Sequence, residues 1–315
     1  MFQGTTEDAG QSRPAMVAFI MLGIFLLSVG IAWWISIDRE QLVREGDRIV
    51  GQIQSSKLES FWHRGEQSYY LIREKQGTVG WRAELRIPRQ GGGFDGLLMQ
   101  VISSGNQPQV HIRKWQLDTT ATNGWFQVAW LEGTEPRIIL NKGYLIEQVS
   151  PNPGKVEVPP NFLPEGTLSL AARLVAQAKG QAFFRSAYIN DSGPREIEGP
   201  QTVNVGLTNL IYKGQEMVQE NGKAIQANVV EVRLGILGKE RTETLYLAPD
   251  GHTVLITRPG QTITPTTLGE LVQIDPSALR MIQQEAFNSG FDLNALKTAP
   301  RTSAKTNPPE EQNQE

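Results

Sequence analysis

Residues 69–87 read YYLIREKQGTVGWRAELRI. Apolar and charged side chains alternate along residues 81–87, and this period of two predicts a strand with one buried face and one solvent-exposed face. The turn sequence Lys75-Gln76-Gly77 separates this strand from the apolar residues 69–72. The whole stretch therefore predicts an antiparallel hairpin, and it indicates a fold built mainly from β-strands.

Further turn signals extend this pattern through most of the chain. The turn at residues 141–143 joins two short apolar runs, and residues 125–131 are apolar on both alternating faces. Strand patterns return over residues 182–258, with turns at 221–222 and 249–251. We expect an antiparallel meander, or a curved sheet or half-barrel, whose two strand-rich stretches could be two similar halves.

Two helices are predicted around the second strand-rich stretch. Apolar residues form one stripe over residues 165–178, between Pro164 and Gly180, which predicts a central amphipathic helix. Its apolar face is expected to lie on the concave side of the sheet. Near the end, Asp275 is a candidate cap for a helix that begins at Pro276. The concave side is expected to be apolar, with surface supplied by Trp81, Leu85, Val230 and Val232.

One N-terminal segment is suited to a membrane. Residues 15–37 read AMVAFIMLGIFLLSVGIAWWISI and contain no charge, and a helix of this length covers roughly 34 Å, enough to cross a hydrocarbon core of about 30 Å. Trp33 and Trp34 lie where indole rings favour the headgroup layer. Gly30 and Ala32 would also suit a signal-peptide cleavage site, but the apolar run exceeds the usual ~7 to 15 residues. An uncleaved anchor fits better.

The orientation of this anchor rests on opposing signals. Only Arg13 precedes the apolar run, whereas Arg39, Arg44 and Arg48 follow it, which favours a cytoplasmic domain. Two observations favour a domain outside the cytoplasm: short N-terminal leaders usually stay inside, and large domains cross the membrane largely regardless of their charge. We expect a single-pass membrane protein whose large C-terminal domain is extracytoplasmic. A chain that begins near Ser55 is expected to be soluble.

The predicted organisation has eight parts. They are a leader (1–14), a transmembrane helix (15–37), a juxtamembrane connector (38–60), a first β module (61–150), a proline-rich joint (151–164), a helix with a second β module (165–274), a C-terminal helix (275–297) and a disordered tail (298–315). The connector could continue the helix, although Gly46 and Gly51 weaken that pattern.

Composition argues against several functions. The formal charge of -3 gives no basic surface for nucleic acid, and the absence of cysteine removes thiolate chemistry and the usual Cys/His zinc sites. The three histidines have no ligand spacing, and no catalytic, cofactor or metal motif is present. The acid pairs Glu196/Glu198 and Glu231/Glu243 could face each other across strands, yet a solvated sheet face explains them equally well. We therefore predict no catalytic, cofactor-binding or metal residues.

The tryptophans of the first strand-rich half are the remaining candidates for a site. Core packing is the simplest explanation, but Trp81, Trp115, Trp125 and Trp130 could also line an apolar concavity for a lipid tail, peptide or sugar. The helix LSLAARLVAQAKG (168–180) and the hairpin ETLYLAPDGHTVLI (243–256), within a strand meander, resemble the half-open β-barrels of bacterial lipoprotein carriers (LolA-like). This resemblance covers residues 60–260 at most and implies binding of acyl chains or peptides. Those carriers are secreted or lipid-modified, and no site residue carries over.

These observations favour a membrane-anchored envelope protein, not an enzyme, whose β domain binds an apolar ligand such as a lipid or peptide, or docks a partner protein. The alternative is a membrane-anchored hydrolase that uses carboxylates in the concavity of the sheet. The bilayer is the one partner that the sequence indicates directly.

Overall fold

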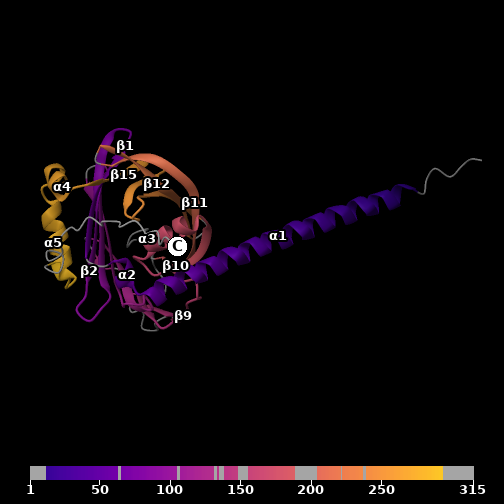
Figure 1. The fold of residues 1–315 in the computed structure, drawn as a ribbon, viewed down its shortest axis with the longest axis horizontal. Coiled ribbons are helices and arrows are strands. Elements are labelled where there is room, and N and C mark those ends of the chain that lie inside the picture. The colour runs from indigo at the N-terminus through magenta and orange to yellow at the C-terminus, as the bar shows by residue number, and fades with distance from the viewer. Residues whose placement is uncertain are drawn as a thin grey trace, which may run out of the picture.

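The computed structural model describes residues 12–293, except for 63–64, 105–106, 131–132, 135–137, 148–154, 189–203, 221 and 237–238. It confirms a mainly β fold that follows one N-terminal apolar helix (Figure 1). The helices are α1 (Ser12–Ser56), α2 (Leu58–Phe61), α3 (Leu168–Ala178), α4 (Leu268–Ile274) and α5 (Ala278–Asn288).

The described strands all belong to one sheet. They are β1 (Glu66–Glu74), β2 (Gly77–Pro88), β3 (Phe94–Ser104), β4 (Gln107–Leu117), β5 (Asn123–Trp130), β6 (Gly133–Thr134), β7 (Ile138–Asn141), β8 (Tyr144–Glu147), β9 (Lys155–Glu157), β10 (Gln181–Tyr188), β11 (Asn204–Glu220), β12 (Lys223–Ile236), β13 (Lys239–Leu247), β14 (Thr253–Arg258) and β15 (Gln261–Thr266).

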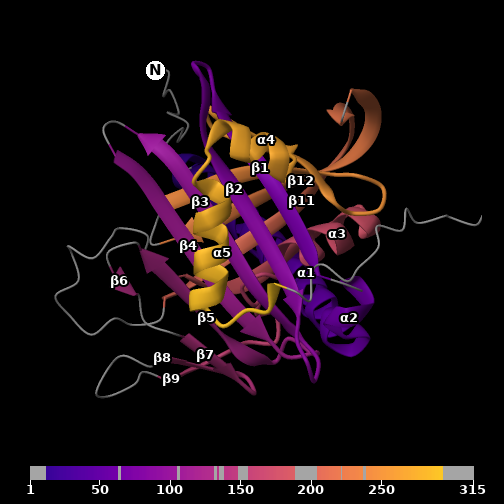
Figure 2. The same ribbon diagram turned by 90° about the vertical axis from the view of Figure 1, so that its left-hand side faces the viewer.

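The sheet is an open antiparallel meander. Its order is β10-β11-β12-β13-β14-β15-β1-β2-β3-β4-β5-β7-β8-β9, with β6 beside β5, so strands of both predicted β modules are joined through the pair β15–β1. The turns at residues 75–77, 141–143 and 249–251 connect paired strands, as the sequence predicted. Figures 1 and 2 show the sheet curving around α3 into a half-barrel.

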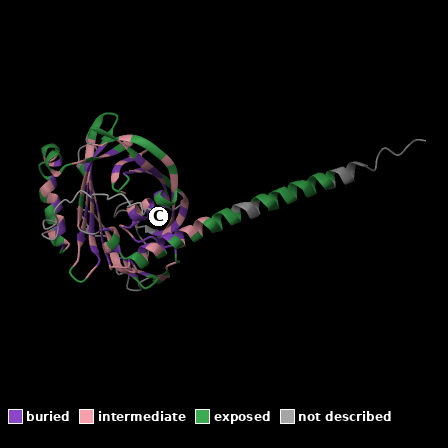
Figure 3. Ribbon diagram, viewed as in Figure 1, coloured by how far each residue is buried: buried purple, intermediate pink, exposed green. Residues whose placement is uncertain are grey.

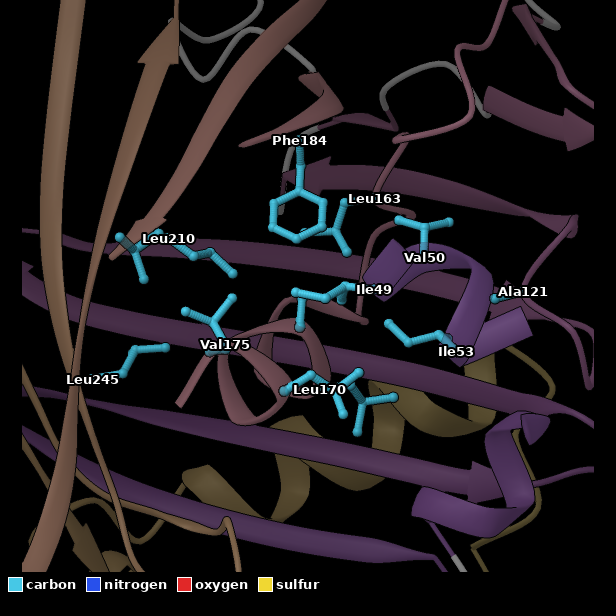
Figure 4. Packing of buried hydrophobic residues seen from close by; sticks show 14 of the residues in the cluster. Ile49, Val50, Ile53, Ala121, Leu163, Leu170, Val175, Phe184, Leu210 and Leu245 are labelled. Atoms are coloured by element: carbon cyan, nitrogen blue, oxygen red, sulfur yellow. The ribbon is translucent and has the colours of Figure 1, made fainter. Parts of the chain in front are cut away.

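Each face of the sheet carries its own hydrophobic cluster. The inner cluster joins α3, α2 and the end of α1 to strands that include β12 and β13; Figure 4 shows Val175 of α3 beside Leu210 and Leu245. The outer cluster joins β2, β3 and β4 to α4 and α5, which lie outside the sheet (Figure 2). The predicted central helix is therefore confirmed as α3, and it docks inside the curve.

The expected concave surface was only half right. Val230 and Val232 belong to the inner cluster with α3, as expected. Trp81 and Leu85 belong instead to the outer cluster, under α4 and α5. The prediction was wrong for these two residues because β2 is covered on both faces. The alternation of apolar and charged residues shows which side chains share a face, but it does not show which element covers that face.

The N-terminal helix enters the domain without a break. Side chains described between residues 17 and 40 are exposed, and the helix is long and apolar enough to cross a membrane (Figure 3). Further on, Ile49, Val50 and Ile53 are 0%, 3% and 2% exposed and lie in the inner cluster. The segment predicted as a connector is therefore helical up to Ser56, and its end forms part of the core of the β domain.

The contact between α1 and β10 depends on Gly46. A Cβ atom at Gly46 would lie 2.1 Å from the carbonyl oxygen of Phe183, a backbone atom that cannot rotate away. Gly46→Ala is therefore expected to push α1 off β10 and to lower the free energy of unfolding by about 1–3 kcal/mol. Thermal unfolding of the detergent-solubilised protein, followed by tryptophan fluorescence, measures this effect.

A second helical glycine provides the control for Gly46→Ala. A Cβ atom at Gly51 would meet nothing within 4 Å, so Gly51→Ala is expected to leave stability unchanged or raise it by about 0.5–1 kcal/mol. Equal unfolding temperatures for the two variants would show that the close approach at Gly46 is unimportant.

The C-terminal helices close the outer face. α5 begins at Ala278, close to the predicted start at Pro276, and Lys114 of β4 forms an ion pair with Glu285 of α5. Asp275 accepts hydrogen bonds from the backbone and hydroxyl of Ser277. α5 ends at Asn288, so the predicted extension of this helix to residue 297 was wrong over residues 289–293, and the predicted disordered tail lies outside the described residues.

Candidate functional site: a charged cavity inside the half-barrel

A cavity of about 350 Å³ lies on the concave side, between the sheet and the start of α3. Its walls include residues of β2, β3, β4, β12, β13, β14 and β15. Five arginines line it, namely Arg82, Arg86, Arg113, Arg241 and Arg258. Three glutamates line it as well, namely Glu84, Glu165 and Glu243. Glu66 lies outside the lining but pairs with Arg86, so the five arginines exceed the glutamates around them by one positive charge.

The pleat of the central strand places these charges inside the molecule. Alternate residues of a strand point to opposite faces, so residues 82, 84 and 86 face the cavity while residues 81, 83, 85 and 87 pack in the outer cluster. The face that the sequence marked as solvent-exposed therefore lines an interior cavity.

Glu84 is the centre of the first ion-pair group. Its carboxylate lies 2.5 Å from the guanidinium of Arg82 and 3.4 Å from that of Arg86. Arg86 also pairs with Glu66, donates a hydrogen bond to the hydroxyl of Ser169 at 3.1 Å, and lies over the ring of Trp62. This group ties β2 to the first turn of α3.

Glu243 is the centre of the second group. Its carboxylate lies 2.8 Å from the guanidinium of Arg258 on β14 and 3.4 Å from that of Arg241 on its own strand. The two groups are electrostatically joined, because Arg82 acts on Glu243 and Arg258 acts on Glu84. Residues about 160 positions apart in the sequence thus form one network.

The network shifts the protonation of its members. Burial alone would raise the pKa of Glu84, but the neighbouring Arg82 and Arg86 outweigh it and hold that pKa below 4.5. The pKa of Glu243 is lowered in the same way, by Arg258 and Arg241 against burial. Burial lowers the pKa of Arg258 to about 10, and the like charges of Arg82 and Arg241 add to this despite Glu243.

Two arginine donors in this network are unused within the described part of the chain. The buried Nε atoms of Arg82 and Arg258 have no hydrogen-bond partner there. The side chains are only 13% and 11% exposed, so solvation from bulk water is small. A buried donor without a partner is costly, and cavities that contain one are suited to an acceptor group.

The structure separates the predicted tryptophans whose side chains it describes. Of these three, only Trp115 borders the cavity, where it lies near Trp62 in the inner cluster. Trp81 packs on the opposite face and donates a hydrogen bond to Asp275 at 2.7 Å. Trp125 is half-buried beside the outer cluster and donates to Gln116, while the side chain of Trp130 lies outside the described part.

The candidate histidines and acids are also scattered. His111 lines the cavity, whereas His252 lies between Asp250 and Glu220, away from it, and His63 lies outside the described residues. Glu196 and Glu198 lie outside them as well. Glu243 is paired in register with Val232, and Glu231 with Thr244, so Glu231 and Glu243 do not face each other across the strands.

The described residues contain no group of three or more His, Asp or Glu side chains that could hold a metal ion. What the cavity offers chemically is positive charge, hydrogen-bond donors and an apolar wall. The sequence reasoning missed the arginines because charged residues in alternation were taken as evidence of a solvent-exposed face.

Comparisons with protein-family models, with curated proteins and with solved structures gave no match. The resemblance to lipoprotein carriers therefore rests on the sequence pattern alone.

Proposed function

We propose that this chain is a single-pass membrane protein of a cell envelope whose half-barrel binds a ligand in the cavity on its concave side. The cavity is the observation that carries this proposal. Its volume of about 350 Å³ falls within the ~300–1,000 Å³ typical of small-molecule sites, and apolar and polar groups share its wall.

The structure changes the kind of ligand expected. α3 and the end of α1 fill part of the concave side, so a long extended peptide or several acyl chains have little room. The remaining cavity has apolar residues such as Leu98, Leu168 and Leu234 beside the arginine network. A small ligand with both an apolar and a polar part fits this wall better than a purely apolar one.

The hydrolase alternative gains no support from the acids of the cavity. General acid catalysis by a carboxyl group requires a pKa raised toward neutrality. Arginines instead hold the pKa of Glu84 and the pKa of Glu243 below the ordinary value. Docking of a partner protein stays a prediction from the sequence.

Membrane anchoring can be tested by extraction. The full-length protein is expected to sediment with membranes and to resist sodium carbonate, because the apolar part of α1 has no partner in the described structure that would bury it. Recovery of the full-length protein in the carbonate supernatant would contradict the anchor.

The extracytoplasmic orientation is tested by protease access. Protease added to cells with a permeabilised outer layer is expected to digest the β domain, while a cytoplasmic marker protein stays intact. Digestion only after lysis would place the domain in the cytoplasm, as Arg39, Arg44 and Arg48 would favour.

Ligand binding is tested by native mass spectrometry of the full-length protein purified from membranes. We expect a bound small molecule on the wild type and its loss in Leu234→Trp, which fills the cavity. Met217→Trp is the matched control, because Met217 is 65% exposed on β11 and does not line the cavity. A wild-type protein that carries no small molecule under any extraction condition would contradict the proposal.

A further inference from the structure

The geometry points to an oxyanion as the polar part of the ligand: a carboxylate or phosphate bound between Arg82, Arg258 and the start of α3, with its apolar part along the leucine-rich wall. This inference rests on the proposed ligand-binding function and specifies the chemistry of that ligand.

The charge balance of the network is the first argument. Arg82, Arg86, Arg241 and Arg258 pair with three carboxylates: those of Glu84 and Glu243 in the cavity, and that of Glu66, which pairs with Arg86 and is 44% exposed. The network therefore carries one more positive than negative charge. Arg82 and Arg258 are nearly buried, so bulk solvent screens their mutual repulsion poorly. A buried surplus of positive charge is costly unless an anion compensates it. An anionic group in the cavity would remove that cost.

The unused donors are the second argument. The Nε atoms of Arg82 and Arg258 are buried without a hydrogen-bond partner among the described residues. They belong to β14 and β2, which are separated in the sheet by β15 and β1 and which both line the cavity. Guanidinium groups match carboxylate and phosphate oxygens in geometry, so an oxyanion is the acceptor that suits these two side chains.

The first turn of α3 is the third argument. Gly166, Leu168 and Ser169 line the cavity, so the N-terminal end of this helix, with its partial positive charge, faces the same space. The first turn contains no acidic residue, and the hydroxyl of Thr167 donates to the carbonyl of Pro164 instead of capping the helix. Glu165 precedes this turn, but it pairs with Arg113 at 3.6 Å.

The apolar wall indicates the rest of the ligand. Leu98, Leu168, Leu234 and Leu245 line the cavity beside the arginines. An acid with a short hydrocarbon part satisfies both regions, whereas a free oxyanion satisfies only the charged one. The oxyanion could belong to a lipid or to a soluble metabolite, and the titrations below distinguish a free oxyanion from one with a hydrocarbon part.

Three probes distinguish the contribution of the ligand's charge from that of its hydrocarbon part. Octanoate, octanol and inorganic phosphate are each titrated into the full-length protein in phosphatidylcholine nanodiscs by isothermal titration calorimetry, with empty nanodiscs subtracted. We expect octanoate to bind at least about tenfold more tightly than octanol, because only the acid pairs with the arginines. Phosphate that binds as tightly as octanoate would contradict the apolar part of the ligand and would identify a free oxyanion. Tighter binding of octanoate than of phosphate would support an acid with a hydrocarbon part.

Variants test the residues named. Arg258→Gln is expected to weaken octanoate binding roughly tenfold and to leave octanol unchanged. Arg233→Gln is the matched control, because Arg233 is an exposed arginine of β12 that pairs with Glu231 and does not line the cavity. Glu243→Gln removes a negative charge and is expected to tighten octanoate binding several-fold, a gain that loss of folding cannot produce.

The outcomes distinguish the two proposals. Equal affinity for octanoate and octanol, with no effect of Arg258→Gln or Glu243→Gln, would overturn the oxyanion and leave ligand binding standing. Absence of binding for all three probes, together with a ligand-free wild type in mass spectrometry, would overturn both.

Discussion

A chain that begins at Ser55 is expected to misfold, because the last turns of α1 belong to the core of the β domain. Ile49, Val50 and Ile53 are almost completely buried in the inner cluster. Each such side chain contributes about 1.5–3 kcal/mol, so their joint loss removes roughly 5–9 kcal/mol. Domains of this kind are stable by only about 5–15 kcal/mol. Circular dichroism and sedimentation velocity would show an aggregated or loosely folded product.

The matched control is a chain that begins at Asp38. It lacks the apolar segment and keeps residues 38–56 of α1, so it is expected to be soluble and to unfold cooperatively. If the chain from Ser55 melts cooperatively at the same temperature as the chain from Asp38, the end of α1 contributes nothing to the core. The burial of Ile49, Val50 and Ile53 is the reason why misfolding is expected here, in place of the sequence-based expectation that a chain from Ser55 is soluble.

Glu84→Gln is expected to lower the free energy of unfolding by about 3–5 kcal/mol. Glu84 compensates Arg82 and Arg86 inside the cavity, and loss of one partner leaves buried positive charge unpaired. Urea unfolding of the chain from Asp38 measures this difference. Glu240→Gln is the control, because Glu240 is 61% exposed and 3.8 Å from Arg233, where an ion pair contributes less than about 1 kcal/mol.

The same substitution has a pH signature. The folded-state pKa of Glu84 lies below its ordinary value of 4.5, so its stabilising effect is complete above pH 4.5 and is lost as pH falls toward the folded-state pKa. The wild type is therefore expected to lose stability below pH 4.5 more steeply than Glu84→Gln. Parallel pH profiles for the two proteins would contradict the role of Glu84.

Local patterns predicted most of the secondary structure. Turn residues and alternation identified the hairpins β1–β2, β7–β8 and β13–β14, and the apolar stripe between Pro164 and Gly180 identified α3. These features depend on neighbours in the sequence, so the sequence contains the information. The burial of Ile49, Val50 and Ile53 was harder to predict from the sequence. Their pattern is that of any amphipathic helix end, and the residues that they contact lie on β10 and α3, far away in the sequence.

The site was largely beyond sequence reasoning. Alternation showed that residues 82, 84 and 86 share one face, but it could not show that α3 and the far side of the half-barrel enclose that face. Their partners Glu243 and Arg258 come from strands on the other side of the β15–β1 junction. Buried charge resembles exposed charge in a single sequence, and only the tertiary structure separates the two.

The unbroken path of α1 ties the orientation of the β domain to that of its anchor. The helix rises about 1.5 Å per residue, so Gly46, in contact with β10, lies roughly 13 Å beyond Ile37. With α1 across a bilayer, as proposed, there is no flexible joint between the membrane-spanning part of the helix and the β domain. A change in the tilt of the helix therefore tilts the half-barrel by the same angle, and a rotation of the helix about its axis changes the direction in which the cavity opens. Bilayer thickness influences helix tilt, so it would also influence the distance of the cavity from the membrane surface and the orientation of the cavity.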